Sequence, residues 1–167
     1  VRKLARYLKT EKIKADKLGK KFQGVRDHYL FLGNPGTGKT TVARIMANVF
    51  RSLGVTSKSG IIEVDRSKLI SKFKGETTEL VNKQVNLALG SILFVDEAYA
   101  LKQGPQDDFG QEAIDTLLKR MEDDRGKFIC IAAGYTKEMQ EWIASNSGLE
   151  SRFNKKIEFE DYDATSL

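Results

Sequence analysis

Residues 33 to 40 read Gly-Asn-Pro-Gly-Thr-Gly-Lys-Thr, which matches the phosphate-binding pattern G-x-x-x-x-G-K-[ST] of the P-loop. The apolar run 29–32 precedes this stretch, and an apolar-periodic segment, 42–53, follows it. A strand, a glycine loop and a helix N-terminus in this order form an anion site from backbone N–H groups and the helix dipole. A plain glycine turn would not explain the Lys-Thr pair after the last glycine. The stretch therefore predicts a phosphate site.

The positions of the P-loop have expected roles in binding ATP and Mg²⁺. Lys39 should reach the β- and γ-phosphates, and Thr40 should place its hydroxyl on Mg²⁺. Backbone N–H groups from Gly36 to Thr40 should surround the phosphates. The residues of the loop and first helical turn that we expect to contact the nucleotide are Asn34, Pro35, Gly36, Thr37, Gly38, Lys39, Thr40 and Thr41.

Strand and helix patterns alternate along the rest of the chain. The strands read as continuous apolar runs, which is typical of a parallel sheet covered by helices on both faces. Residues 102–108 are polar and contain Gly104-Pro105, so we expect a loop there. Thr136 is the expected N-cap of the helix that follows it. We expect strands at about 28–32, 61–65, 92–95, 127–133 and 156–160, and helices at about 2–20, 39–53, 77–89, 109–121 and 136–144, the last ended by 146–148.

Asp96 and Glu97 follow the apolar run 92–95, an arrangement typical of the Walker B segment of P-loop ATPases. Asp96 should hold Mg²⁺, directly or through water, and Glu97 should orient and deprotonate the attacking water. Two acids at a strand end are common by themselves. In parallel sheets, however, the ligand lies at the carboxyl ends of the strands, where the P-loop also lies. The pair therefore favours Mg²⁺-dependent hydrolysis.

Composition indicates one domain, spanning 1–167, of a globular protein with 40% apolar and 31% charged residues. No apolar run approaches the roughly 20 residues of a membrane span, and we expect no signal peptide. A single cysteine, Cys130 in an apolar strand, excludes internal disulfides and favours an intracellular, cytoplasmic protein.

The net charge of +5 is unevenly distributed. Residues 1–26 hold ten Lys/Arg and two acids, a net +8, whereas 27–167 hold eighteen and twenty-one, a net −3. Only the first segment could attract nucleic acid, but a solvated face of an amphipathic helix explains its charge as well. The apolar stripe expected on that helix consists of Leu4, Leu8, Ala15, Leu18 and Phe22.

Two further residues stand out, although the sequence alone leaves their roles open. Arg152 follows a helix break just before the last strand, where a plain surface arginine is the simpler interpretation. Phe73 lies between Lys72 and Lys74, ahead of Gly75. It could form a hydrophobic staple onto the next helix, or it could have a function.

The chain resembles the AAA+ ATPases, and within them the CbxX/CfqX group, which includes red-type Rubisco activase, the stage V sporulation protein K type and ATPases of type VII secretion. The match runs over nearly the whole chain, and the Asp-Glu-Ala-Tyr and Gly-Gln-Glu-Ala-Ile sequences narrow it to this group. The segments that carry the resemblance are 33–44, 92–99, 109–114, 133–135 and 151–153.

The resemblance implies a P-loop NTPase fold with a five-stranded parallel sheet in the order 5-1-4-3-2. It implies a hexameric ring in which Arg152 is an arginine finger that reaches the nucleotide of the neighbouring subunit, so that an isolated subunit is a poor ATPase. Tyr135 stands where many AAA+ proteins place an Asn or Thr that senses the γ-phosphate. Phe73, Lys74 and Gly75 would face the central pore and grip a substrate polypeptide, with 102–108 as a second pore loop.

The sequence departs from the family pattern at Lys74, where pore loops usually carry an aliphatic residue, and at Tyr135. Relative to the family, we expect the adenine-contacting segment before the first helix and the helical lid after the last strand to be absent. We favour an ATP-driven remodeller of an unidentified protein substrate. The alternatives are a nucleic-acid-linked AAA+ ATPase of the loader type and a nucleotide-binding adaptor with little turnover.

Overall fold

The computed structural model describes residues 6, 9–10, 13, 17 and 27–161. The apolar stripe expected on a helix over about 2–20 lies outside these residues.

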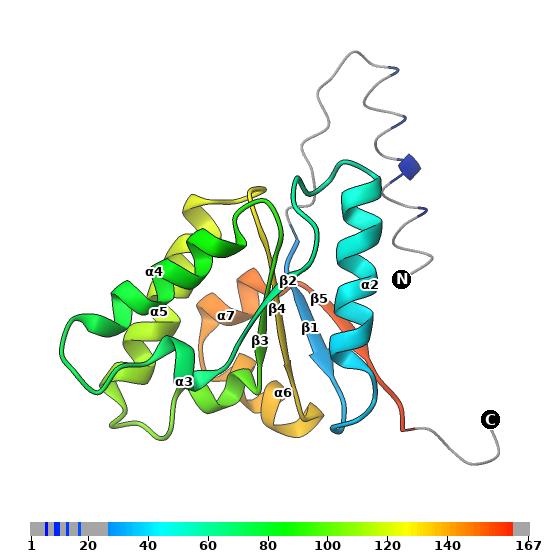
Figure 1. Ribbon diagram of the computed structural model, residues 1–167. Helices are drawn as coiled ribbons and strands as arrows, with labels where there is room; N and C mark the ends of the chain where they lie inside the picture. The colour runs from blue at the N-terminus through cyan, green and yellow to red at the C-terminus, as the bar shows by residue number, and fades with distance from the viewer. Residues whose placement is uncertain (1–5, 7–8, 11–12, 14–16, 18–26, 162–167) are drawn as a thin grey trace.

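Within the described residues, five short strands form a single sheet in which every pairing is parallel. The strand order is β2-β3-β4-β1-β5, which confirms the order expected from the family resemblance. Figure 1 shows the sheet edge-on, with helices packed on both of its sides. The strands are β1 Tyr29–Leu32, β2 Ile61–Val64, β3 Ile92–Asp96, β4 Ile129–Gly134 and β5 Lys155–Glu158.

Four helices of the described region, α2, α4, α5 and α6, occupy the segments where apolar periodicity predicts them, with ends within two residues of the expected positions. Three shorter elements, α3, η1 and α7, escape prediction from the sequence, because each is a single turn or little more and carries too few residues for a periodic pattern. The bounds are α2 Lys39–Ser52, α3 Arg66–Leu69, α4 Glu76–Ala88, η1 Ala98–Leu101, α5 Asp108–Asp123, α6 Thr136–Ala144 and α7 Ser147–Arg152.

The sheet separates two apolar cores, and β1 contributes to both. Tyr29 and Phe31 face the smaller core, which α2 covers. Leu30 and Leu32 face the larger core, to which α4, α5, α6 and α7 contribute. All four β1 residues are therefore buried, which explains the continuous apolar run before the P-loop. The same packing buries Cys130 completely, as its place in an apolar strand predicts.

Two local expectations around α6 need correction. Thr136 is the first residue of the helix, and its N-cap is Tyr135, whose side chain makes no capping bond. The chain leaves β4 and turns directly into α6, so the cap falls one residue earlier than side-chain preference predicts. The break at 146–148 also starts a new helix, because the Asn146 side chain accepts a bond from the N–H of Gly148 at 2.8 Å. Arg152 is therefore the last residue of α7.

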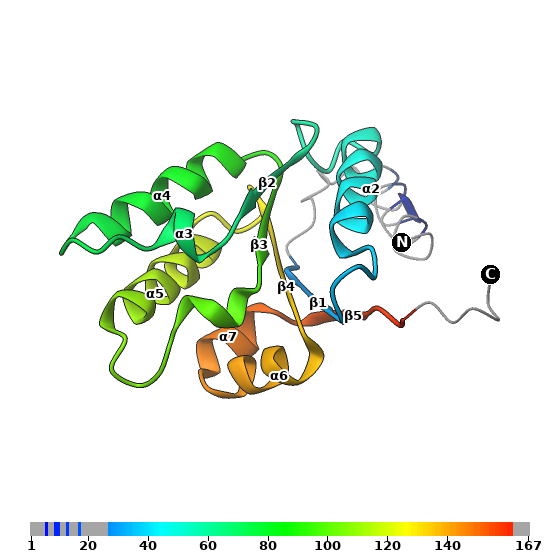
Figure 2. The same cartoon turned by 60° about the horizontal axis from the view of Figure 1, so that its bottom comes forward.

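The carboxyl ends of β1, β3 and β4 meet at one edge of the sheet, at the bottom of Figure 1 and turned toward the viewer in Figure 2. The P-loop leaves β1 there, Asp96 ends β3, and Gly134 ends β4. This is the convergence that the parallel sheet predicts.

Candidate active site

The P-loop turns sharply between β1 and α2. Gly36 and Gly38 adopt left-handed backbone angles, with φ of 78° and 91°. The Thr37 hydroxyl donates to the carbonyl of Asn34 at 2.7 Å and closes the loop from within. Gly38 caps α2 without a side chain, and the N–H groups of 36–41 donate no hydrogen bond within residues 27–161. The loop thus presents a cluster of free donors at a helix N-terminus, which suits an anion.

Lys39 lies in the first turn of α2 and folds back over the loop. Its ammonium group donates to the carbonyl oxygens of Gly33 at 2.7 Å and Asn34 at 2.8 Å. Burial lowers the pKa of Lys39, while the nearby Asp96 carboxylate acts in the opposite direction. The side chain of Asn34 points elsewhere, since its amide donates to both carboxylate oxygens of Asp161, at 3.1 and 3.0 Å.

The acidic pair at the end of β3 is exposed and has an unusual backbone. Glu97 has φ 48° and ψ 51°, and it is the one non-glycine residue with positive φ in the described part of the chain. Its N–H donates to Oδ1 of Asp96 at 3.0 Å, and its carbonyl accepts from the N–H of Ala100 at 2.9 Å. A left-handed non-glycine residue persists only where its surroundings hold it, and such residues cluster at functional sites.

A cavity of about 410 Å³ brings the loop and the acidic pair together. The predicted residues that line it are Pro35, Gly36, Gly38, Lys39, Thr40, Thr41, Asp96, Glu97 and Tyr135. Asn34 and Thr37 are not among its lining residues. Gly33 and Gly134, which the sequence did not single out as site residues, do line it. Both are glycines at strand ends beside predicted site residues, and the N–H of Gly33 donates to the Gly134 carbonyl at 3.1 Å.

A second cavity, of about 600 Å³, adjoins the first and shares Asp96 and Glu97 with it. Its other walls come from α3, the segment after α3, η1 and α5, including Arg66, Lys72, Ala100 and Phe109. The acidic pair therefore stands between two hollows, one on the P-loop side and one on the side of β2 and α3.

The site contains oxygen groups that suit Mg²⁺. Thr40 and Asp96 both line the main cavity, and both also line a smaller hollow of about 150 Å³ between α2 and the ends of β2 and β3. Among the described residues, no cluster of three or more His, Cys, Asp or Glu side chains could hold a metal alone. A hydroxyl and one carboxylate fit Mg²⁺, which usually takes one or two protein ligands together with phosphates and water.

Arg152 lies at the opposite edge of the sheet from this cavity. β5 runs parallel to β1, and its first residue pairs with Tyr29 at the amino end of β1. Arg152 shares a small hollow there with His28 and Glu122, and its Nε lies 3.6 Å from the Glu122 carboxylate. That buried Nε has no hydrogen-bond partner within the described residues. The structure thus separates Arg152 from the site in its own subunit.

Phe73 lies in the loop between α3 and α4, followed by Lys74 and by Gly75, the N-cap of α4. The residue is 69% exposed, so the prediction of a hydrophobic staple onto α4 is wrong. The N–H of Phe73 donates to the Ser71 hydroxyl at 3.1 Å. The loop presents a large aromatic side chain to solvent, away from both cores.

Tyr135 follows β4 and forms part of the cavity wall. Its ring lies 6.2 Å from that of Tyr99, measured between centroids, with the ring planes at 50°. Tyr99 comes two residues after Glu97, so this contact ties the end of β4 to the segment after the acidic pair.

A parallel sheet in this order, with a P-loop and an acidic pair at its carboxyl edge, defines the class of P-loop nucleoside triphosphatases. The family model described as the ATPase family associated with various cellular activities (AAA) matches residues 29–161. The chain belongs to this family and carries its nucleotide-binding ATPase domain.

Proteins of sporulation and secretion systems are among the relatives of the chain. The chain is 49% identical over 140 residues to stage V sporulation protein K of Bacillus subtilis, covering 84% of this chain and 44% of that protein. It is 45% identical over 159 residues to the ESX-1 secretion system protein EccA1 of Mycobacterium leprae, covering 93% and 28%. It is 46% identical over 142 residues to the ESX-3 secretion system protein EccA3 of Mycolicibacterium smegmatis, covering 84% and 23%. The chain thus spans less than half the length of these relatives.

The helices of the described region differ from a membrane span in length and hydropathy. None of those helices is both long enough and apolar enough to cross a bilayer.

Proposed function

We propose that this chain is the catalytic domain of an ATP-driven, ring-shaped machine, and that its main cavity binds ATP with Mg²⁺ and hydrolyses it. One observation carries the proposal: a single cavity unites the free N–H groups of the P-loop, Lys39 and the acidic pair. Donors for phosphate oxygens and a carboxylate for water thus face the same space.

The P-loop would hold the phosphates. The free N–H groups of 36–41 would donate to them, supported by the dipole of α2. The ammonium of Lys39 would exchange its two carbonyl partners for phosphate oxygens, which make stronger, charge-assisted bonds. Thr40 and Asp96 would hold Mg²⁺, which offsets negative charge on the phosphates during the reaction.

Glu97 would act as the general base. Its carboxylate would orient a water molecule and accept its proton as the water attacks the terminal phosphate. The backbone angles of Glu97 support this role, because they set the side chain's direction independently of the extended strand before it. Tyr135, at the cavity wall, would contact the terminal phosphate.

Arg152 would complete the site of a neighbouring subunit in a hexameric ring. Its position at the far edge of the sheet, away from the cavity of its own subunit, supports a role outside that subunit. An arginine finger typically contributes about 10³ to 10⁵ in rate, so the isolated chain should hydrolyse ATP weakly. We infer that 1–167 is the large nucleotide-binding subdomain, and that adenine contacts and a helical lid come from other segments of the protein.

The work done by hydrolysis would be the remodelling of a protein substrate, in the manner of a chaperone. The exposed Phe73, with Lys74 and Gly75, supports a loop that grips a polypeptide in the central pore, with 102–108 as a second pore loop. One relative is named for a secretion system, which agrees with a protein substrate, and we propose a cytoplasmic location for this chain. The net charge of −3 over 27–167 argues against nucleic acid as the main partner.

The test is Glu97→Gln in the full-length protein. Because glutamine keeps the shape but cannot accept the proton, we expect nucleotide affinity to stay within about twofold while kcat falls by at least about 10². Phosphate release and the binding of a fluorescent ATP analogue measure the two quantities. Glu79→Gln, an exposed acid on α4, is the matched control and should behave as wild type. Turnover at the wild-type rate in Glu97→Gln would refute the assignment of the acidic pair.

A further inference from the structure

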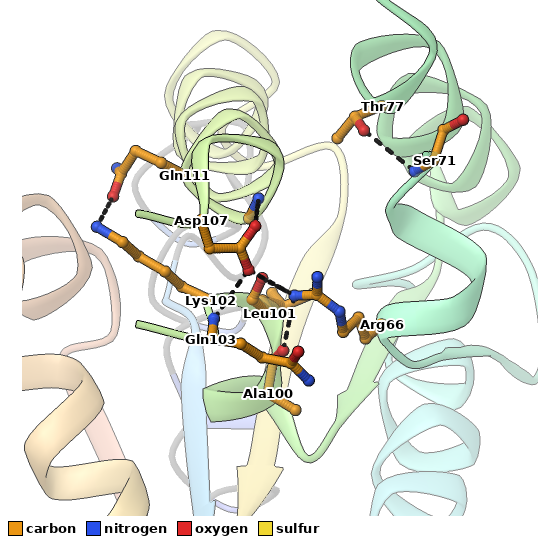
Figure 3. A network of polar contacts seen from close by, with 10 residues as sticks. Arg66, Ser71, Thr77, Ala100, Leu101, Lys102, Gln103, Asp107 and Gln111 are labelled. Atoms are coloured by element: carbon orange, nitrogen blue, oxygen red, sulfur yellow. Dashed lines mark hydrogen bonds and ion pairs between the residues drawn. The ribbon is translucent and has the colours of Figure 1, made fainter. Parts of the chain in front are cut away.

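A single arginine connects three separate segments beside the acidic pair (Figure 3). Arg66 is the first residue of α3, two residues after the end of β2. Its Nη1 donates to the carbonyl of Ala100 at 3.1 Å, to the carbonyl of Leu101 at 2.6 Å and to Oδ2 of Asp107 at 2.9 Å. The two charged side chains are partly buried, with 29% and 12% of their surfaces exposed. We call this pair the Arg66–Asp107 clasp.

Asp107 is the second half of the clasp and organises the loop before α5. Its Oδ1 accepts from the N–H of Gly110 at 3.0 Å, which caps α5, and its Oδ2 accepts from the N–H of Gln103 at 2.8 Å. Burial would raise the pKa of this carboxyl, but the two N–H donors and the Arg66 guanidinium outweigh burial and hold the pKa below its usual range. Asp107 is therefore a carboxylate, and both of its oxygens accept hydrogen bonds.

The clasp holds the far end of the turn that begins at Glu97. η1 runs from Ala98 to Leu101, and its last carbonyls have no partner within so short a helix. Arg66 supplies the missing donors at Ala100 and Leu101. Ala100 in turn donates its N–H to the Glu97 carbonyl at 2.9 Å. The left-handed backbone of Glu97 is thus stabilised by the bond from Ala100 at one end of this turn. Hydrogen bonds from Arg66 fix the other end.

The atoms around the clasp are tightly packed. A Cβ atom added to Gly110 would meet the carbonyl oxygen of Leu101 and lie 2.6 Å from Oδ2 of Asp107. The Leu101 side chain is fully buried, so the turn cannot move outward without opening the larger core. A small displacement of Arg66 or Asp107 should therefore also displace the backbone of Glu97.

Arg66 also belongs to the helix that leads into the loop that carries Phe73. The N–H of Ile70 donates to the Arg66 carbonyl at 3.0 Å, the N–H of Ser71 donates to the Thr77 hydroxyl at 3.1 Å, and Phe73 follows. Arg66 thus lies near the start of the segment that runs from β2 to Phe73. Its side chain donates hydrogen bonds to η1, the turn that follows Glu97.

We propose that Arg66 and Asp107 are positioning residues for ATP hydrolysis, which hold Glu97 in its working orientation. Neither residue lines the main cavity, and the hydrogen bonds that connect Arg66 to the turn after Glu97 are those to the carbonyls of η1. The inference rests on the proposed function, since it needs Glu97 to be the base.

The first test is Asp107→Asn in the full-length protein. Asparagine keeps one carbonyl oxygen to cap α5, but it loses the second acceptor and the charge that hold Arg66 and Gln103. Because a shift of about 1 Å in a reacting group can cost up to about 10² in rate, we expect kcat to fall by between about tenfold and a hundredfold. The thermal unfolding midpoint should fall by about a few degrees, because the variant removes the charge that pairs with Arg66. Nucleotide affinity should stay close to that of the matched control, Asp123→Asn, which changes an exposed acid at the end of α5.

The second test asks whether the pair acts as a unit and through Glu97. Arg66→Gln should lower kcat as Asp107→Asn does, and the double variant should lower it no further. Arg66→Lys, which keeps the charge and three donors, should recover part of the loss, and Arg51→Gln, an exposed arginine on α2, should lose nothing. In a Glu97→Gln background, Asp107→Asn should leave the residual single-turnover rate unchanged, because the group that it positions is gone.

The outcomes separate this inference from the proposed function. Wild-type turnover in Asp107→Asn and Arg66→Gln, with Glu97→Gln inactive, would overturn the clasp and leave the proposed function intact. A further loss of rate in the Glu97→Gln background, or a loss of nucleotide affinity in parallel with kcat, would show a structural role instead and would also overturn the clasp. If Glu97→Gln itself is fully active, the proposed function fails first and the clasp loses its target.

Discussion

His28 is the only histidine of the sequence, and it lies 4% exposed just before β1. Its Nδ1 accepts a hydrogen bond from the N–H of Cys130 at 2.9 Å, which requires that nitrogen to carry no proton. Burial is the main cause that lowers the His28 pKa to about 4; Asp27 opposes it, while Arg125 and Arg152 add to it. The imidazole is therefore neutral in the folded protein at physiological pH.

This lowered pKa predicts a pH-dependent loss of stability. Above about pH 6.5 the side chain is neutral in both states, and its contribution is fully present. Between about pH 6.5 and 4 the unfolded chain binds the proton and the folded protein does not, so the free energy of unfolding should fall by up to about 3 kcal/mol. Urea unfolding of wild type and His28→Asn, whose amide oxygen can accept the same bond, measures the difference. Equal pH dependence of the two proteins in this window would contradict the prediction.

At the scale of the elements, α4 and α5 are tied together by one side chain as well as by apolar packing. Arg120 on α5 donates to Asp124 at 2.6 Å, to Asn82 at 3.1 Å and to Asn86 at 2.7 Å, the last two on α4. Its side chain is 17% exposed. These helices flank the segments that carry Phe73 and the clasp, so their alignment supports both.

Removing this tie should destabilise the domain. Hydrogen bonds to charged groups contribute about 1.5 to 3 kcal/mol, and we expect Arg120→Ala to lower the free energy of unfolding by about 2 kcal/mol. Arg120→Lys, which keeps the charge but not the planar fork, should lose less. Chemical denaturation measures both. Lys119→Ala, at the exposed neighbouring position, is the control, and a loss in Arg120→Ala no larger than in Lys119→Ala would show that the tie contributes nothing.

At the scale of the whole molecule, the two edges of the sheet carry different parts of the proposed reaction. The carboxyl edge holds the nucleotide cavity, and Arg152 lies at the amino edge. Two groups that face opposite ends of a rigid sheet serve one site only if the site is shared between copies of the chain. A heterologous, ring-closing contact achieves this sharing.

Mixing two inactive variants of the full-length protein tests the shared site. Arg152→Ala should bind nucleotide but turn over poorly, and Lys39→Ala should lack a working P-loop. In a random equal mixture, about a quarter of the contacts would pair an intact P-loop with an intact Arg152, so we expect up to about a quarter of the wild-type rate. A chain carrying both substitutions, mixed with either single variant, is the control and should restore no activity, because no contact then pairs an intact P-loop with an intact Arg152. A mixture no more active than its two components would exclude a finger acting between subunits.

Much of the site can be predicted from sequence because its signals are local. The glycines of the P-loop, Lys39 and Thr40 act within a stretch of eight residues, and the acidic pair adjoins a buried strand. The sheet order follows from the family resemblance. The cap of α6 differs by one residue from its prediction, because the path of the chain out of β4 overrides the preference of Thr136 for the cap position.

The sequence by itself determined the class of fold, the P-loop and the acidic pair, since each depends on backbone conformation and burial over a few neighbouring residues. Only the tertiary structure decided that Phe73 is exposed, that Arg152 lies at the far edge of the sheet, and that Arg66 and Asp107 meet. Those last two residues are 41 positions apart in the chain. Such contacts depend on how all the elements pack together, and no short stretch of sequence contains that information.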